Sequence, residues 1–166
     1  MSWEALTAVV SVLSVVVLAA AAIAAVIQIR HLRAGNQLEG FLEVSRELES
    51  PELLTARAFV ELELADKLED DVYRQELISG RFDLMRHPEI RIANFWEKMG
   101  ALIRHGVLDA PLFYDFFAHR CAVRWEQLRP VVELMRQRDA LMWGDFEHIA
   151  DRCQRYLEHG RRGGSW

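Results

Sequence analysis

The sequence predicts an all-α protein in which an N-terminal transmembrane helix continues into a cytoplasmic helical bundle of about five to six helices. Two observations lead to this fold. A run of 25 residues without a charged side chain separates Glu4 from Arg30, and the rest of the chain shows helical spacing of apolar residues without alternating β-branched stretches. The predicted parts are an external tail (1–4), a membrane span (5–29), a helical extension (30–49), a helical domain (50–159) and a flexible tail (160–166).

The apolar run has the length and composition of a membrane span. Thirteen of its residues are Leu, Ile or Val, and eight are Ala. As a helix it reaches about 37 Å, against a hydrocarbon core of about 30 Å, and its large aliphatics contribute roughly −4 to −8 kcal/mol to insertion. A cleaved signal peptide needs a basic N-terminal region and a shorter core. A buried core helix needs a larger surrounding domain. Both alternatives are therefore less favoured.

The residues beside the run set its orientation. Arg30 and Arg33 follow it and no basic residue precedes it, so the positive-inside rule places the N-terminus outside and the domain in the cytoplasm, at the inner (plasma) membrane. Trp3 is expected at the outer interface as an aromatic anchor, with Arg30 and Arg33 at the inner one. Small residues four apart, Ala20 with Ala24 and Ala21 with Ala25, would let a second helix approach closely.

Cap residues and apolar stripes predict the helices that follow the span. One stripe should carry the first helix on to about residue 49 and includes Ala34, Leu38, Phe41, Ser45 and Leu48. The next helix should begin at Ser50-Pro51-Glu52 and run through Leu53, Leu54, Ala58 and Val60 toward Leu64. The acidic cluster 69–71 should mark a break, and a weaker helix should follow at about 70–85.

Further start and stop signals divide the C-terminal half. His87-Pro88-Glu89 should open a helix that Gly106 ends, and Asp109 should cap the following one. Pro130 should kink or break that helix. A last helix should open at Gly144-Asp145.

Charge and cysteine usage exclude some classes of partner. The net charge is −5 and no basic patch is evident, so nucleic acid is not an expected partner. Residues 39–71 hold eleven acidic side chains against three basic ones, which indicates solvated helix faces or, less favoured, complementary faces within the fold or between protomers. In a cytoplasmic domain Cys121 and Cys153 should be reduced.

One polar cluster is a candidate site. Asn94 and Glu97 lie three residues apart beside Phe95 and Trp96, which favours a shared helix face on which a ligand or a proton-transfer step could be held. The favoured alternative is structural: Glu97 would pair with Arg124 or Arg129, and Asn94 would satisfy a loop carbonyl.

Metal, cofactor and catalytic signatures are weak. The set His119, Cys121, His148 and Cys153 has spacings that match no zinc signature, so we expect no metal and no cofactor. No phosphate loop, metalloprotease motif or nucleophile elbow occurs in the sequence, which makes an enzyme the less favoured class.

Several short motifs follow one another in a distinctive order: Gln28 to Arg33, Asn36 to Gly40, Ser50 to Leu53, Asn94 to Glu97 with the glycines and Asp109 after it, Trp125 to Pro130, and Phe146-Glu147. In this order the chain resembles a bacterial family of small single-span membrane proteins with a helical domain of unknown function. The resemblance implies an anchor followed by helices and no activity. We therefore expect a membrane-anchored interaction or scaffold module, bound to the bilayer and to an unknown protein or itself. The alternative is a ligand-binding or enzymatic module near Asn94 and Glu97.

Overall fold

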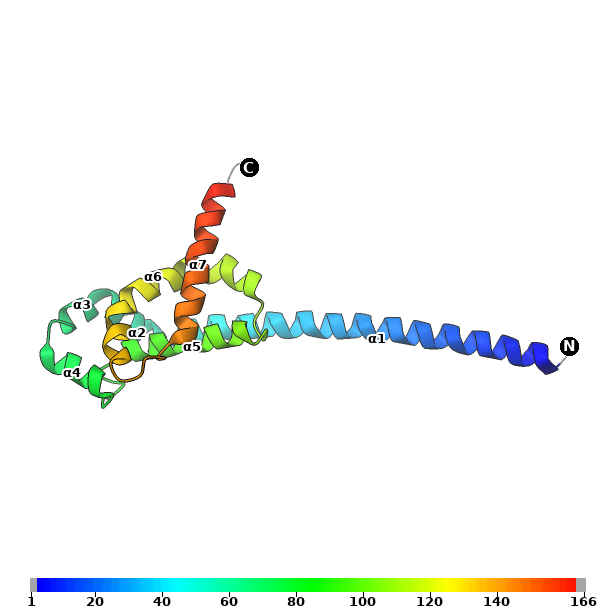
Figure 1. Ribbon diagram of the computed structural model, residues 1–166, viewed down its shortest axis with the longest axis horizontal. Coiled ribbons are helices and arrows are strands. Elements are labelled where there is room, and N and C mark those ends of the chain that lie inside the picture. The colour runs from blue at the N-terminus through cyan, green and yellow to red at the C-terminus, as the bar shows by residue number, and fades with distance from the viewer. Residues whose placement is uncertain (1–2, 164–166) are drawn as a thin grey trace. The chain divides into compact units, whose positions relative to one another are not determined.

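The structure, a computed structural model, is all-helical over the residues that it describes, which confirms the predicted fold class (Figure 1). It describes residues 3–163, and for side chains it leaves out 4–13, 29–38 and 161–163. The helices are α1 (Trp3–Leu48), α2 (Pro51–Leu62), α3 (Leu64–Lys67), α4 (Asp71–Ser79), α5 (Glu89–Arg104), α6 (Ala110–Arg136) and α7 (Gly144–Gly163). The chain divides into two compact units, Met1–Gly40 and Phe41–Trp166.

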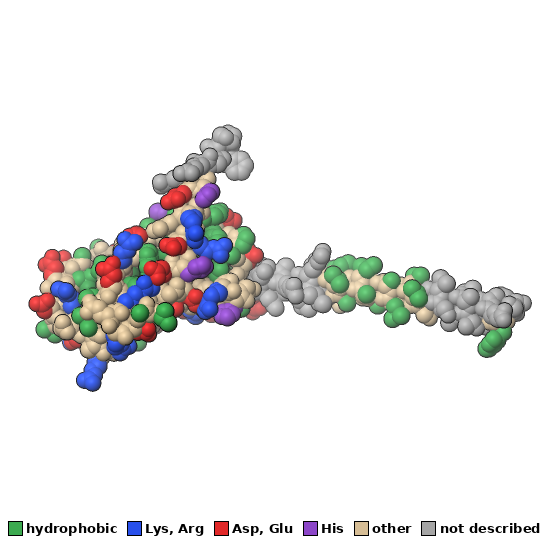
Figure 2. Space-filling view, viewed as in Figure 1, with side chains coloured by type: hydrophobic (Ala, Val, Ile, Leu, Met, Phe, Trp, Pro, Cys, Tyr) green, Lys and Arg blue, Asp and Glu red, His purple; other side chains and the backbone are tan. Residues whose placement is uncertain are grey.

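The N-terminal unit is the long helix α1 up to Gly40. Its described large aliphatic side chains are 50–69% exposed (Figure 2), and they are Val15, Val16, Val17, Leu18, Ile23, Val26 and Ile27. Trp3 is 81% exposed. Within the described part of the chain, no helix has the length and apolarity needed to cross a membrane, so this finding does not support the predicted transmembrane helix. The side chains of residues 5–13 and 29 of the predicted span, and those of Arg30, Arg33, Ala34 and Leu38, lie outside the described residues.

The second unit, called the helical domain below, begins with the last two turns of α1. Val44 is buried in the core, and Phe41 and Leu48 pack against it. An ion pair between Glu47 and Lys98 joins this end of α1 to α5. The predicted stripe therefore packs on the domain at its described positions.

The short helices α2 to α4 begin and end at local signals in the sequence. The Ser50 side chain accepts a hydrogen bond from Leu53 N at 3.4 Å, and Asp70 Oδ1 accepts one from Val72 N at 2.8 Å. Gly80, at φ +67°, ends α4 five residues earlier than the predicted 85. Helix α2 turns Leu53, Ala56 and Val60 to the core, whereas Leu54 and Ala58 are exposed.

Helix α6 continues through Pro130 as one helix, so the predicted break does not occur. The proline lies on the solvent side, between Leu128 and Val131, whose side chains are fully buried. Packing on both sides of the proline therefore holds the helix together despite the lost backbone hydrogen bond. Its start is as predicted, since Asp109 Oδ1 accepts a hydrogen bond from Leu112 N at 2.9 Å.

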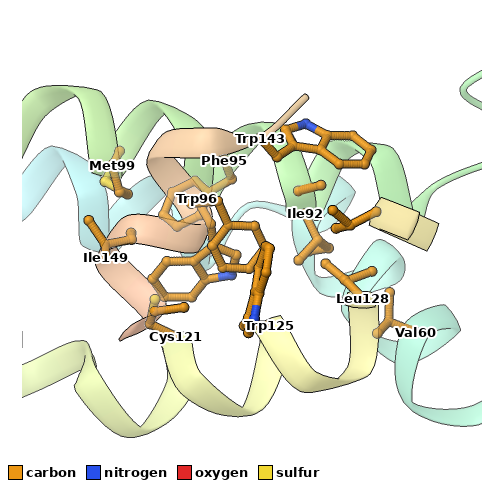
Figure 3. Packing of buried hydrophobic residues seen from close by; sticks show 14 of the residues in the cluster. Val60, Ile92, Phe95, Trp96, Met99, Cys121, Trp125, Leu128, Trp143 and Ile149 are labelled. Carbon is orange, nitrogen blue, oxygen red and sulfur yellow. The ribbon is translucent and has the colours of Figure 1, made fainter. Parts of the chain in front are cut away.

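The core of the helical domain lies where α5, α6 and α7 meet. Figure 3 shows Trp96, Trp125 and Ile149 converging from these three helices. Trp96 stacks on Phe146 at a ring-centroid distance of 6.2 Å, and Trp125 meets the same ring edge-on at 5.0 Å. A large aromatic cluster therefore fixes α7 against the α5–α6 pair.

Gly100 allows α5 to approach the start of α7. A Cβ atom at this position would lie 2.4 Å from the carbonyl oxygen of Asp145, which is too close for any side chain. The Asp145 carboxylate also accepts a hydrogen bond from Arg104 Nη2 at 2.8 Å. Helix α7 itself extends through Gly163 and so includes residues 160–163, which were predicted as flexible tail.

Candidate functional site

The structure does not bring the four predicted polar residues together. Asn94 and Glu97 lie on α5 and face the start of α7: Asn94 Oδ1 accepts a hydrogen bond from Trp143 Nε1 at 2.9 Å, and Glu97 Oε2 accepts one from Phe146 N at 2.7 Å. Phe146 N is in the first turn of α7, where amides have no partner within the helix. Glu97 therefore caps α7 from a neighbouring helix, and its charge complements the positive helix end.

The two arginines of the predicted cluster, Arg124 and Arg129, pair with residues other than Asn94 and Glu97. Arg124 forms an ion pair with Glu61 on α2 and a hydrogen bond with Gln127. Arg129 pairs with Glu126 at 3.3 Å on the surface of α6. Neither arginine contacts Glu97, so the described geometry holds no acid–base site of these four residues.

The turn before α7 explains why Asn94 and Glu97 are both engaged. Trp143 has φ +55°, in the left-handed region that non-glycine residues rarely adopt, and its side chain is only 3% exposed. The hydrogen bonds to Asn94 and Glu97 hold the two ends of the strained segment 143–146. We interpret this pair as a clamp that positions α7.

A second polar cluster, which sequence reasoning missed, is buried between α4 and α5. The His87 and Glu89 side chains are fully buried. His87 Nδ1 lies 3.0 Å from Glu89 Oε1, and His87 Nε2 lies 2.9 Å from Glu76 Oε2. Tyr73 Oη donates to Glu89 Oε1 at 2.7 Å, and Arg86 donates to Glu76 at 2.7 Å.

Both ring nitrogens of His87 face carboxylate oxygens, Nδ1 that of Glu89 and Nε2 that of Glu76. A neutral imidazole carries one N–H and can donate to only one of these carboxylates. Burial raises the pKa of Tyr73, and its hydrogen bond to Glu89 adds to the rise, so the phenol stays a donor. Glu89 Oε2 has no hydrogen-bond partner in the described part of the chain. The cluster is closed to solvent at His87 and Glu89, which fits a structural role.

The structure does not gather the four residues of the weak metal signature into one site, although its two cysteines meet. Cys121 and Cys153 are free, fully buried thiols. Burial raises the pKa of the Cys121 thiol, and its hydrogen bond with Cys153 adds to the rise. His119 and His148 line two different hollows. Among the residues that the structure describes, no group of three or more potential metal ligands occurs.

One hollow of the helical domain is a groove of about 490 Å³ between α2 and α6. Buried side chains of α5 and α6 form its floor, including Phe95, Trp96 and Phe117. Its rim carries basic and acidic residues from both flanking helices, including Arg57, Arg120 and Glu61. We call this feature the α2–α6 groove. Phe95 and Trp96, the aromatic neighbours of Asn94 and Glu97 in the sequence, line the groove, but Asn94 and Glu97 do not.

The fold is a helical-bundle domain that follows an exposed apolar helix. The polar residues in its interior connect one helix to another. The chain belongs to the DUF4760 family, a domain of unknown function, whose family model matches residues 15–153. The expected resemblance to a domain of unknown function is thereby confirmed. No curated protein and no solved structure matches the chain.

Proposed function

We propose that the protein is a membrane-anchored interaction module, with the N-terminal part of α1 as a single-pass anchor and the helical domain as the part that meets its partner. The observation that carries the anchor is the exposure of seven large aliphatic side chains between Val15 and Ile27. An apolar helix surface of this extent is unstable in water and marks a contact with lipid or protein. The uncharged sequence between Glu4 and Arg30 would reach about 37 Å as a helix, which is long enough to span a bilayer.

The proposed orientation follows from basic residues in the sequence. Arg30 and Arg33 lie directly after the apolar run, and none lies before it, which favours a cytoplasmic helical domain at the inner membrane of a bacterium. Trp3 would then lie at the outer interface, where aromatic side chains are enriched.

The helical domain is proposed to act by binding rather than by catalysis. Its candidate acid–base residues, Asn94 and Glu97, already hold the start of α7. Several large apolar side chains instead point to solvent, and these include Leu62 at 78%, Met85 at 80% and Leu141 at 85% exposed. The partner is proposed to be another protein or a second copy of this chain, which the small residues from Ala20 to Ala25 would admit within the bilayer.

Two charges placed in the anchor should release the protein from membranes. Each arginine near the centre of a span costs about 2.5–3.5 kcal/mol, so Val17→Arg with Ile23→Arg offsets most of the roughly 4–8 kcal/mol gained from the aliphatics. The unchanged chain should stay in the membrane pellet after alkaline carbonate extraction, and the double variant should move to the supernatant.

The matched control is Leu62→Arg with Leu141→Arg, two exposed leucines in the helical domain. This control variant should remain in the pellet. The anchor is contradicted if alkaline carbonate releases the unchanged chain, or if both double variants partition alike.

A further inference from the structure

The α2–α6 groove has the dimensions of a small-molecule site. Its volume of about 490 Å³ lies within the usual range of about 300–1,000 Å³ for ligand pockets. Leu54 on α2 and Val123 on α6 lie on its two sides and remain 40% and 38% exposed. The ion pair between Arg124 and Glu61 joins the same two helices at the groove. A folded partner would be too large for this space, whereas a flexible chain fits it.

The floor of the groove is apolar and aromatic. Ile92, Phe95 and Trp96 from α5 are at most 4% exposed, and Phe117 from α6 completes the surface. Such a floor offers dispersion contacts and gives little hydrogen bonding to a polar ligand. The part of the ligand that lies on it should therefore be aliphatic.

The rim carries one more positive charge than negative. Arg57, Arg120 and Arg124 line the groove together with Glu49 and Glu61, in a chain whose net charge is −5. Arg124 is already satisfied, because it binds Glu61 and Gln127. Its hydrogen bond to Glu61 lowers the pKa of that carboxyl and keeps it ionised beside Arg124.

Arg57 and Arg120 are the rim cations that remain for a ligand. Both side chains are exposed, as is that of His119, and none of the three forms a side-chain hydrogen bond or ion pair with another described residue. Arg57 acts on Glu61 only through its charge. Arg57 lies one turn before Glu61 on α2, and Arg120 lies one turn before Arg124 on α6. Two guanidinium groups therefore belong to opposite walls of the groove, each one turn from the Arg124–Glu61 pair.

From this arrangement we infer that the α2–α6 groove binds a long-chain carboxylate, a molecule of the free fatty-acid class. Its aliphatic chain lies over Phe95, Trp96 and Phe117, and its carboxylate is held by Arg57 and Arg120. A single negative charge matches the excess of one arginine on the rim, and a guanidinium binds a carboxylate through paired hydrogen bonds. This inference goes beyond the proposed interaction role, because it assigns the domain a small-molecule ligand.

A photoreactive palmitate analogue with a diazirine in its chain tests the inference on the full-length protein in native membranes. After irradiation, mass spectrometry should find the label on groove peptides of α2, α5 and α6. Arg57→Gln with Arg120→Gln should lower this labelling at least about tenfold, because two charge-assisted contacts are lost. Val123→Glu, which places a like charge at the wall, should do the same. Lys67→Gln with Arg81→Gln, two exposed cations that do not line the groove, should leave labelling unchanged.

A palmityl alcohol analogue with the same diazirine separates charge recognition from apolar adsorption, and its weaker labelling should not respond to the arginine substitutions. The inference is overturned if the groove stays unlabelled, or if the carboxylate and alcohol probes label it equally in all variants. Labelling of residues 14–28 by either probe reports lipid contact of the anchor. If residues 14–28 carry no label while the groove peptides do, the proposed anchor is contradicted and the proposed ligand site is supported.

Discussion

Replacing His87 by alanine is expected to destabilise the helical domain by about 3–5 kcal/mol, the usual cost of removing one partner from a buried charged pair. Glu89 is fully buried, and only Tyr73 would still donate to it. The lost imidazole also leaves Glu76 with Arg86 alone. Urea unfolding followed by tryptophan fluorescence should show a lower midpoint with an unchanged slope.

A companion substitution distinguishes this charge effect from lost packing. Adding Glu89→Gln to His87→Ala should restore part of the stability, because a neutral amide costs less to bury than an unpaired carboxylate. Arg86→Ala is the control, since the Arg86 side chain is 59% exposed and its ion pair is worth at most about 1 kcal/mol. A His87→Ala variant within about 1 kcal/mol of the unchanged chain would rule out the charged cluster.

Phe146→Ala is expected to cost about 3–5 kcal/mol, as large-to-small changes of buried aromatic residues do. The ring is fully buried, stacks on Trp96 and meets Trp125 edge-on. Its removal leaves a cavity where α7 joins α5 and α6. Differential scanning calorimetry should show a fall in the melting temperature of the helical domain.

Phe116→Ala is the matched control for the Phe146 prediction. Its ring is 61% exposed and packs edge-on against Phe41 at 5.0 Å, so we expect a loss below about 1.5 kcal/mol. Equal effects of the two substitutions would show that the aromatic cluster at Phe146 does not carry the packing of α7.

Helix boundaries were the part of the fold that sequence could predict. Ser50, Asp70 and Asp109 lie directly before α2, α4 and α6, and their side chains accept the first amide hydrogen bonds. These interactions join residues two or three positions apart, so the local sequence specifies them. Gly80 and Gly106 have positive φ values, which glycine adopts without a steric penalty, so these helix ends also depend on the local sequence.

Contacts between distant helices could not be predicted in this way. His87-Pro88-Glu89 reads as a helix start, and a helix does begin there. Nothing local shows that Tyr73 and Glu76 of α4 would enclose the same two side chains. Glu97 was likewise assigned an arginine partner, whereas its hydrogen-bond partner is an amide 49 residues away. Tertiary packing decides which polar side chain meets which.

One local rule was overridden by packing. Proline lacks an amide hydrogen and disfavours a helix interior by about 3 kcal/mol, yet α6 continues through Pro130. Twelve residues of α6 are buried, including Leu128 and Val131 beside the proline. Burial of this extent exceeds the cost of one proline, because each fully buried aliphatic side chain contributes about 1.5–3 kcal/mol.

We propose that the apolar part of α1 lies in a lipid bilayer and that the helical domain lies outside it. The chain suits a direct test, because Cys121 and Cys153 are fully buried and should not react with a thiol reagent. Leu18→Cys and Leu62→Cys, at positions 69% and 78% exposed, can each carry a bimane fluorophore in proteoliposomes. The proposal predicts blue-shifted emission and quenching by acyl-chain spin-labelled lipids at position 18 alone. Water-like emission and no lipid quenching at position 18 would contradict it.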